Sequence, residues 1–301
     1  MNKFLRQCAF LFPLALLAGC GSQAGSNPFN NSSSIVSSGG SGSTSGSGTT
    51  TGSGGGSTTG GTGTTTGSTS SGSTSGGGTT GGSAPGIPAN AKVISDIQKM
   101  TNWENCTDCT NGAFAAYTMT QGVSSPSLTG ASAQFTLLNG TAPWGQALWW
   151  KYLTRDDTAT HFVYDLYFYL DNPKAAQGLE FSVSQSVGGN RYEFATQCAM
   201  TSEGTWRVWD PIKQAWAGSS VSCPVPSANA WHHLTWEFER NSANQLVFDA
   251  VTLDGNRGVV NMVEAHQSDS SNGLDVSMQM DAKDGPILYS VWLDKISVTY
   301  W

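Results

Sequence analysis

Apolar and polar side chains alternate along most of the chain beyond residue 130. From Leu179 to Val183 the alternation is strict, and Glu180 is the first of the polar set. Successive side chains of a strand point to opposite faces of a sheet, so this pattern predicts a strand with one buried face. A Gly-Gly-Asn turn then leads to a second predicted strand over residues 192–198.

Further strands of the same kind follow with turn residues between them, and Asp254-Gly255 marks one hairpin turn. Only residues 91–103, with near-helical spacing of apolar residues, predict a short helix or a loop. The strand pattern predicts an all-β fold, a two-sheet antiparallel sandwich of the jelly-roll kind. The predicted strands are residues 133–138, 147–153, 161–170, 178–187, 192–198, 206–210, 215–216, 233–239, 246–253, 259–260, 276–280 and 289–300.

Composition divides the chain into three parts. Residues 1–20 carry Lys3 and Arg6 ahead of an apolar run that is too short to remain in a bilayer as a spanning helix. Residues 21–88 are almost entirely Gly, Ser and Thr, so they predict a disordered tether with an r.m.s. span of roughly 45 Å. Residues 89–301 contain every Asp, Glu, Trp and Tyr of the chain and are expected to form one folded domain.

The end of the first part, Leu17-Ala18-Gly19-Cys20, resembles the lipobox of bacterial lipoproteins. The resemblance implies a lipoprotein signal peptide over residues 1–20 and acylation of Cys20, which becomes the membrane anchor. Gly21 stands where inner-membrane lipoproteins of this type carry Asp, which implies the outer membrane. Whether the domain faces the periplasm or the cell surface stays open.

The expected domain is acidic, with 12 Lys and Arg against 21 Asp and Glu, a net charge of −9. Nucleic acid and anionic lipid both need basic patches, so the charge argues against both, and the Cys20 lipid is the only membrane contact expected. An acidic, aromatic-rich surface suits neutral or cationic partners, including neutral glycans. The simpler interpretation is that acidity keeps an exported protein soluble.

Two segments carry a resemblance to a known fold family. They are residues 231–239, Trp-His-His-Leu-Thr-Trp-Glu-Phe-Glu, and Leu253-Asp254-Gly255. They resemble the W-H-x-φ-x-φ … φ-D-G pattern of concanavalin A-like sandwiches such as laminin-G-type domains. The closing segment 290–298 resembles the last strand of bacterial glucanases with that fold. The family includes lectins, hydrolases, lyases and adhesion modules, so the resemblance implies the fold and leaves the function open.

Glucanases of this fold carry the pattern E-x-D-x-x-E on a bulged strand, which places two glutamates about 5 Å apart. The local match runs from Glu180 to Gln185, with Ser182 in place of the Asp and Gln185 in place of the second Glu. Gln cannot exchange a proton as a carboxyl group does. The resemblance therefore implies no catalytic pair, with Glu180 as the remaining candidate, and hydrogen bonds to sugar hydroxyls from these three side chains. Ordinary strand surface is the alternative.

Aromatic side chains are the second feature that points to sugars, because their flat faces stack on sugar rings. Trp206, Trp209 and Trp216 lie on one predicted hairpin and are ligand-binding candidates, as is Tyr192. Core packing is the alternative for each of them. Trp149 and Trp150 are adjacent in a strand, so only one of them is expected to face the core.

Other polar residues offer alternative chemistry. Glu193, Glu237 and Glu239 are rival carboxylates, and His232 and His233 have no metal-ligand spacing and are expected to pack or cap. A polysaccharide lyase would need a Tyr or His base with Arg or Gln beside it. The residues available for such a set are Tyr192, His161, Arg207 and Gln185.

Cysteines and one aspartate complete the candidates. An exported protein meets an oxidising compartment, so we expect the disulfides Cys106–Cys109 and Cys198–Cys223. Related glucanases hold a structural Ca²⁺ through a side chain at the position of Asp294, which makes Asp294 a calcium candidate. No other cofactor is expected.

Taken together, the sequence favours an envelope-anchored, non-catalytic glycan-binding lipoprotein. Two alternatives stay open. One is a glycoside hydrolase or polysaccharide lyase of the jelly-roll type. The other is a laminin-G-like adhesion module whose partner is a surface protein.

Overall fold

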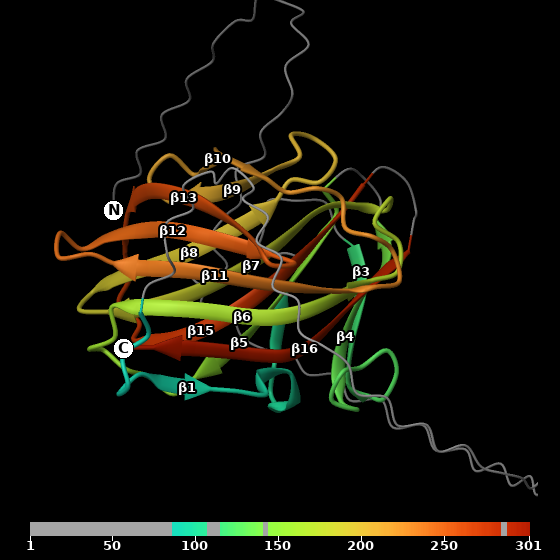
Figure 1. The fold of residues 1–301 in the computed structure, drawn as a ribbon, viewed down its shortest axis with the longest axis horizontal. Coiled ribbons are helices and arrows are strands. Elements are labelled where there is room, and N and C mark those ends of the chain that lie inside the picture. The colour runs from blue at the N-terminus through green and yellow to red at the C-terminus, as the bar shows by residue number, and fades with distance from the viewer. Residues whose placement is uncertain (1–85, 107–114, 141–143, 284–287) are drawn as a thin grey trace, which may run out of the picture. The chain divides into compact units, whose positions relative to one another are not determined.

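The protein is described by a computed structural model of residues 86–106, 115–140, 144–283 and 288–301. These residues form two eight-stranded antiparallel sheets that enclose one core (Figure 1). No helix among them is long and apolar enough to cross a bilayer. The chain crosses between the sheets several times, but β7 to β10 follow one another in one sheet and β11 to β13 in the other. The prediction of an all-β fold with two antiparallel sheets packed as a sandwich is confirmed.

The first sheet, sheet A, has the last strand of the domain, β16, near its middle. The short strand β1 pairs with the second half of β16, and β4 pairs with the first half. In order, its strands are β13 (Asn256–Ala265), β12 (Gln245–Leu253), β11 (Trp231–Arg240), β6 (His161–Leu170), β16 (Tyr289–Tyr300), β4 (Ser132–Gly140) and β3 (Ala115–Val123), with β1 (Lys92–Ile94) beside β16.

The second sheet, sheet B, contains the hairpin that the alternating pattern predicted at residues 178–198. Its strands in order are β10 (Ala215–Ser222), β9 (Thr205–Asp210), β8 (Asn190–Cys198), β7 (Ala176–Val187), β15 (Gly273–Ala282), β5 (Gln146–Leu153) and β2 (Glu104–Cys106), with β14 (Gln267–Ser268) beside β8. Strands β7 and β15 are therefore neighbours, although many residues separate them in the chain.

Aromatic contacts between the sheets build the core. Trp206 of β9 packs edge-on against Trp236 of β11, with ring centroids 5.2 Å apart. Phe194 of β8 stacks on Phe238 of β11 at 5.1 Å. Full burial of an apolar side chain stabilises a fold by about 1.5 to 3 kcal/mol, so such cross-sheet pairs hold the two layers together.

Two hairpin turns follow the residues that the sequence placed there. Gly188 and Gly189, with φ of 63° and 82°, connect β7 to β8, and Asp254 and Gly255, with φ of 51° and 79°, connect β12 to β13. Two-residue turns with positive φ match the twist of antiparallel strands, which explains the use of Gly and Asp. Both turn predictions are confirmed.

The strand predictions also missed several elements. Residues 91–103 contain β1 and one turn of 3-10 helix, η2 (Ile97–Lys99), in place of a longer helix. Strand β3 was not predicted, because it lies at a sheet edge and most of its side chains are exposed or half-buried. The short strands β2 and β14 gave no periodic pattern, and β13 is longer than residues 259–260.

Candidate functional site

The outer face of sheet B gathers polar side chains from several strands. In β7, Leu179, Phe181 and Val183 belong to the core, as the alternation predicts. Glu180 and Ser182 point to the opposite face. The neighbouring strands β8 and β15 pair with β7 without a shift from residue 178 to residue 186, so the same face continues across them.

One line of residues crosses this face from strand to strand. It has aromatic rings at its ends and small side chains between them. We call it the central row: Trp150, Ser277, Ser182, Ala195, Trp209 and Trp216. Neighbouring strands lie about 4.8 Å apart, so the row is about 24 Å long. Three consecutive small side chains occupy its middle part, and all three are buried.

Beside the central row, two carboxyl groups lie in contact, Glu180 of β7 and Asp281 of β15. The amide of Gln197 bridges them, with its Nε2 2.7 Å from Glu180 Oε1 and 3.1 Å from Asp281 Oδ2. A hydrogen bond also joins the two carboxyl groups directly. We call these two residues the carboxyl pair.

The carboxyl pair is held by a surrounding set of polar groups. Gln279 Nε2 donates to Asp281 Oδ1 at 3.0 Å, and the guanidinium of Arg207 donates to the Gln197 carbonyl oxygen. Gly178 leaves space for the pair, since a Cβ there would stand 3.2 Å from Asp281 Oδ2 and 3.3 Å from the Gln197 side chain. The arrangement fixes the Gln197 amide with its nitrogen toward the carboxyl groups.

Burial raises the pKa of both members of the pair. It lifts the pKa of Glu180 well above its ordinary value, and the neighbouring charge of Asp281 raises it further. Burial raises the pKa of Asp281 to about 6. The bond between the two stabilises neutral Glu180 and ionised Asp281, so Glu180 holds the shared proton.

On the other side of the central row lies a second charged group. Arg191 Nη1 stands 3.5 Å from Asp275 Oδ2, and its Nε is 3.9 Å from Glu193 Oε2. Burial raises the pKa of Asp275 to about 6, while the charge of Arg191 opposes the rise. Glu193, a rival carboxylate in the sequence, thus belongs to this group. Four residues along a strand span about 13 Å, so the two carboxylate groups are too far apart to act on one bond.

Three predicted ligand-binding residues do not lie on this face. Gln185 is buried and donates from Nε2 to the carbonyl oxygens of Asp156 and Ala159, at 2.8 and 3.0 Å. Tyr192 and Trp206 are core residues with exposed fractions of 1% and 2%. Their predicted contact with ligand is wrong, because strand alternation directs all three away from the outer face.

The alignment with E-x-D-x-x-E is also wrong. That pattern needs a bulge that brings its first and last residues to one face, and β7 pairs regularly from residue 178 to residue 186. Gln185 therefore does not face Glu180, and the missing second carboxylate was sought in the wrong strand. Asp281 of β15 stands beside Glu180 in its place.

The remaining predicted aromatic residues differ in exposure. Trp209 and Trp216 contact each other at 5.3 Å on the outer face, where Trp209 is 6% exposed and Trp216 is half-buried. Trp149 faces the core and Trp150 the outer face, as expected for adjacent strand residues. Trp216 and Trp150 therefore offer the accessible rings of the central row.

The proposed lyase set is not assembled. Tyr192 and Gln185 are buried, and His161 lies on sheet A, where its ring stacks on Trp301 at 5.1 Å. Of the four candidates only Arg207 reaches the outer face of sheet B. Glu237 and Glu239 likewise belong to sheet A, where Glu237 pairs with Arg257 at 2.7 Å.

Asp294 does not fit a calcium ion. Its carboxylate accepts hydrogen bonds from Gln98 Nε2, from the hydroxyl groups of Ser127 and Thr129, and from the backbone N–H groups of residues 128, 129 and 295. Burial raises the pKa of Asp294, but these donors outweigh it and hold the pKa below its usual range. N–H donors on every side leave no room for a cation, and the described residues contain no cluster of acidic, His or Cys side chains that would bind a metal.

One predicted disulfide is confirmed. Cys198 at the end of β8 is bonded to Cys223 in the loop after β10. In the other predicted pair, Cys106 ends β2, and Cys109 lies outside the described residues. Cys20 lies outside them as well.

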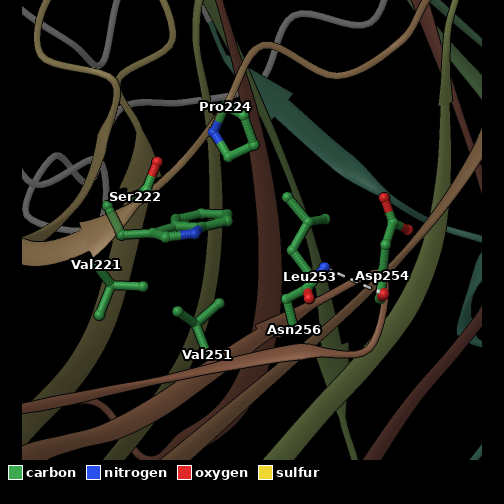
Figure 2. A pocket seen from close by; sticks show the side chains of 8 residues that line it. Val221, Ser222, Pro224, Val251, Leu253, Asp254 and Asn256 are labelled. Atoms are coloured by element: carbon green, nitrogen blue, oxygen red, sulfur yellow. Dashed lines mark hydrogen bonds between the residues drawn. The ribbon is translucent and has the colours of Figure 1, made fainter. Parts of the chain in front are cut away.

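A separate cavity of about 270 Å³ lies at one end of the sandwich (Figure 2). Its walls come from β10, the loop after it, β12 and the turn between β12 and β13. Most of its lining is apolar. The residues around it are Trp206, Val221, Ser222, Pro224, Val251, Leu253, Asp254 and Asn256.

The sequence patterns did not identify Asp281, Gln197 or Gln279 as site residues. A usable signal was present for two of them, because Asp275, Ser277, Gln279 and Asp281 alternate with apolar residues in β15. Their meeting with Glu180 depends on the pairing of β7 with β15, which no local pattern reveals.

No family model and no curated protein matches this chain. Similar solved structures include the cellulose-induced protein Cip1, at 13% identity and a TM-score of 0.43 over 68% of this chain and 96% of that one. Another is the endo-β-1,4-glucuronan lyase of the fungus Trichoderma reesei, at 10% identity and 0.41 over 68% and 94%. A third is the Emp46p carbohydrate recognition domain, at 11% and 0.36 over 60% and 87%. At this level of similarity none of them bears on what the chain binds.

Proposed function

We propose that the outer face of sheet B binds a neutral glycan. The observation that carries the proposal is the central row, in which the small side chains of Ser277, Ser182 and Ala195 lie between aromatic rings. Aromatic faces stack on sugar rings, and carboxyl, amide and guanidinium groups on both sides supply partners for hydroxyl groups. In the proposed complex the sugar chain lies over these small side chains.

Charge supports a neutral ligand. The face carries Glu180, Asp281, Asp275 and Glu193 against two arginines, and these arginines are already paired with carboxylate or amide groups. A polyanion such as nucleic acid or a polyuronate would be repelled by this face. Neutral hydroxyl groups can donate to the carboxylates and accept from the amides.

Substitution of the two accessible rings tests this function. Trp150→Ala and Trp216→Ala are each expected to weaken binding of a glycan found on a glycan array about 5-fold in calorimetry, since an aromatic contact contributes about 1 kcal/mol. Trp292→Ala is the matched control, because Trp292 lies half-buried on the outer face of sheet A. An array without any bound glycan would contradict the proposal and favour a protein partner, and equal effects of all three substitutions would contradict the assignment to sheet B.

Glycoside hydrolysis is a second candidate, favoured by one observation. The proton held by Glu180 next to ionised Asp281 is the property that a general acid needs. The nearest other carboxylates lie across the central row, too far away for a second carboxylate to act on the same bond, so we place binding first. Release of reducing ends by the wild type and not by Glu180→Gln, with unchanged glycan affinity, would establish the hydrolase.

We propose further that the domain is presented from the bacterial outer membrane. The lipobox-like residues 17–20 and the Gly/Ser/Thr-rich residues 21–88 support a lipid anchor followed by a long tether. Such a tether gives the domain a large reach from the membrane. This raises the chance that it meets an extended polysaccharide.

A further inference from the structure

Three polar side chains meet at the end of the sandwich that holds the cavity, away from the outer face of sheet B. Ser227 lies in the loop after β10, His232 lies in β11, and Asp254 is the first residue of the turn between β12 and β13. Ser227 Oγ is 3.1 Å from His232 Nε2. His232 Nδ1 is 2.7 Å from Asp254 Oδ2.

We propose that Ser227, His232 and Asp254 form a nucleophilic triad that hydrolyses esters with a short apolar acyl group. Hydroxyl, imidazole and carboxylate are connected in the order that activates a serine, with one ring nitrogen on each partner. A triad of this kind is defined by the geometry of its three side chains. In unrelated folds the three residues occur in different orders along the sequence.

The imidazole is held in the tautomer that a base requires. Asp254 is fixed by two backbone bonds to His233, one from the His233 N–H to Asp254 Oδ1 and one from the Asp254 N–H to the His233 carbonyl oxygen, both of 2.9 Å. An ionised carboxylate only accepts, so His232 carries its proton on Nδ1 and turns the Nε2 lone pair to Ser227. The ring is also buried and stacks on Phe168 at 5.2 Å.

The protonated form of His232 has a partner as well. Its Nε2 is 3.1 Å from the carbonyl oxygen of Ser227, a contact that becomes a hydrogen bond once Nε2 carries a proton. Within the described residues the backbone N–H groups of Ser227 and Ala228 donate to no protein group. Both residues are exposed, so these N–H groups are open to solvent or to a bound group.

The cavity supplies the place for the acyl group. Asp254 belongs to both the triad and the cavity lining, and Pro224 in the Ser227 loop lines it from the other side (Figure 2). Val251 and Leu253 make the walls apolar. At about 270 Å³ the cavity is at the small end of ligand sites, which limits the group it accepts to a short chain.

The reaction needs only the ester and water. Ser227 Oγ attacks the carbonyl carbon while its proton passes to His232 Nε2. The bond to the alkoxy oxygen then breaks, and the alcohol leaves with that proton, so the acyl group is bonded to Ser227. Water attacks the acyl carbon, gives its proton to His232, and the carboxylic acid leaves as Ser227 recovers its proton.

The test uses the full chain with a fluorophosphonate probe and p-nitrophenyl butyrate. We expect one probe adduct, mapped to the peptide with Ser227, and hydrolysis above the buffer rate. Ser227→Ala is expected to lose both. Ser220→Ala is the matched control, since Ser220 is an exposed serine of β10 outside the cavity lining that makes no contact with His232 in the described structure, and it should keep both.

Asp254→Asn tests the positioning role, because Asn tolerates the positive φ of this turn. It is expected to lower kcat by about 10²- to 10⁴-fold with little change in KM, since the amide no longer fixes the Nδ1–H tautomer. An unlabelled Ser227, or hydrolysis by Ser227→Ala at the wild-type rate, would overturn the triad. Neither result affects glycan binding at sheet B, so the two proposals fail separately.

Discussion

Glu180 keeps a proton under conditions in which an exposed glutamate is ionised. Burial and the adjacent Asp281 disfavour its charge, and the Gln197 amide compensates for only part of this. The proton of Glu180 is used in the bond to Asp281. Contact between two carboxyl groups makes the site selective, but it also destabilises the folded protein. The two negative charges repel each other if both groups ionise.

The pH dependence of stability follows from the direction of these pKa shifts. Glu180 and Asp281 have raised pKa values in the folded state, so the folded protein binds more protons between their unfolded pKa values, near 4, and the folded values. Their contribution is complete below about pH 4 and is lost as pH rises through the raised folded pKa values, which for Asp281 is about 6. Glu180→Gln should therefore raise the free energy of unfolding at pH 7 by about 1 to 2 kcal/mol and have little effect at pH 4.

Urea denaturation at both pH values measures this. Glu104→Gln, at an exposed position of β2, controls for the loss of one negative charge. A stabilisation of equal size in both variants, or one independent of pH, would show that Glu180 is ionised like any surface glutamate.

The contribution of Asp294 to stability has the opposite pH dependence. Its lowered pKa means that its contribution is present above the unfolded pKa near 4 and disappears as pH falls. We expect Asp294→Asn to reduce the free energy of unfolding by about 2 to 3 kcal/mol at pH 7, because the new NH₂ group faces existing donors. Calcium or EDTA should leave the wild-type denaturation midpoint unchanged, and a calcium-dependent midpoint would return Asp294 to the metal ligands.

At the scale of the elements, the hairpin of β9 and β10 depends on one covalent link. The Cys198–Cys223 bond joins the end of β8 to the loop after β10, at a sequence separation of 25. It encloses the strands that carry Trp209 and Trp216. The position of the rings at this end of the central row thus depends on the bond.

Removal of the bond in Cys198→Ala/Cys223→Ala should lower the free energy of unfolding by about 3 kcal/mol, because a loop of this size gains entropy when it is opened. Guanidinium denaturation of the double variant measures the loss. The double variant Cys106→Ala/Cys109→Ala opens a much smaller ring and is expected to lose less. The reverse order of the two losses would contradict the loop-entropy argument.

The sequence predicts those features of the structure that residues close together in the chain determine. The β7–β8 hairpin, its Gly turn and the orientation of Glu180 follow from alternation and turn chemistry, and all were predicted correctly. Gln185 was placed wrongly because a borrowed family pattern overrode the same alternation. The approach of Asp281 to Glu180 and of Ser227 to His232 and Asp254 depends on strand pairing and loop closure, which no local period encodes.

At the scale of the whole molecule, a compact acidic domain is combined with a Gly/Ser/Thr-rich segment and a lipobox-like cysteine. The domain's net charge of −9 opposes close contact with an anionic membrane surface. Anchorage through a lipid at the far end of a tether is compatible with this charge. In the proposed arrangement the lipid supplies the membrane affinity, and the domain stays free to meet its ligand.

Cell fractionation tests the anchor. The wild-type protein is expected in the membrane fraction and Cys20→Ser in the soluble fraction or as an unprocessed precursor, because a single Cys carries the acyl chains. Cys8→Ser removes the other cysteine of the leader and should fractionate as the wild type does. Retention of Cys20→Ser at the membrane in processed form would contradict lipidation at this residue.

The position of β16 determines when the domain can close. This strand lies between β6 and β4 in sheet A, with β1 beside its second half, so it joins parts of the sheet formed from distant segments. A chain that has not been synthesised as far as Tyr300 lacks the strand that unites them. Such a chain presents open sheet edges and stays a substrate for chaperones and proteases until β16 pairs.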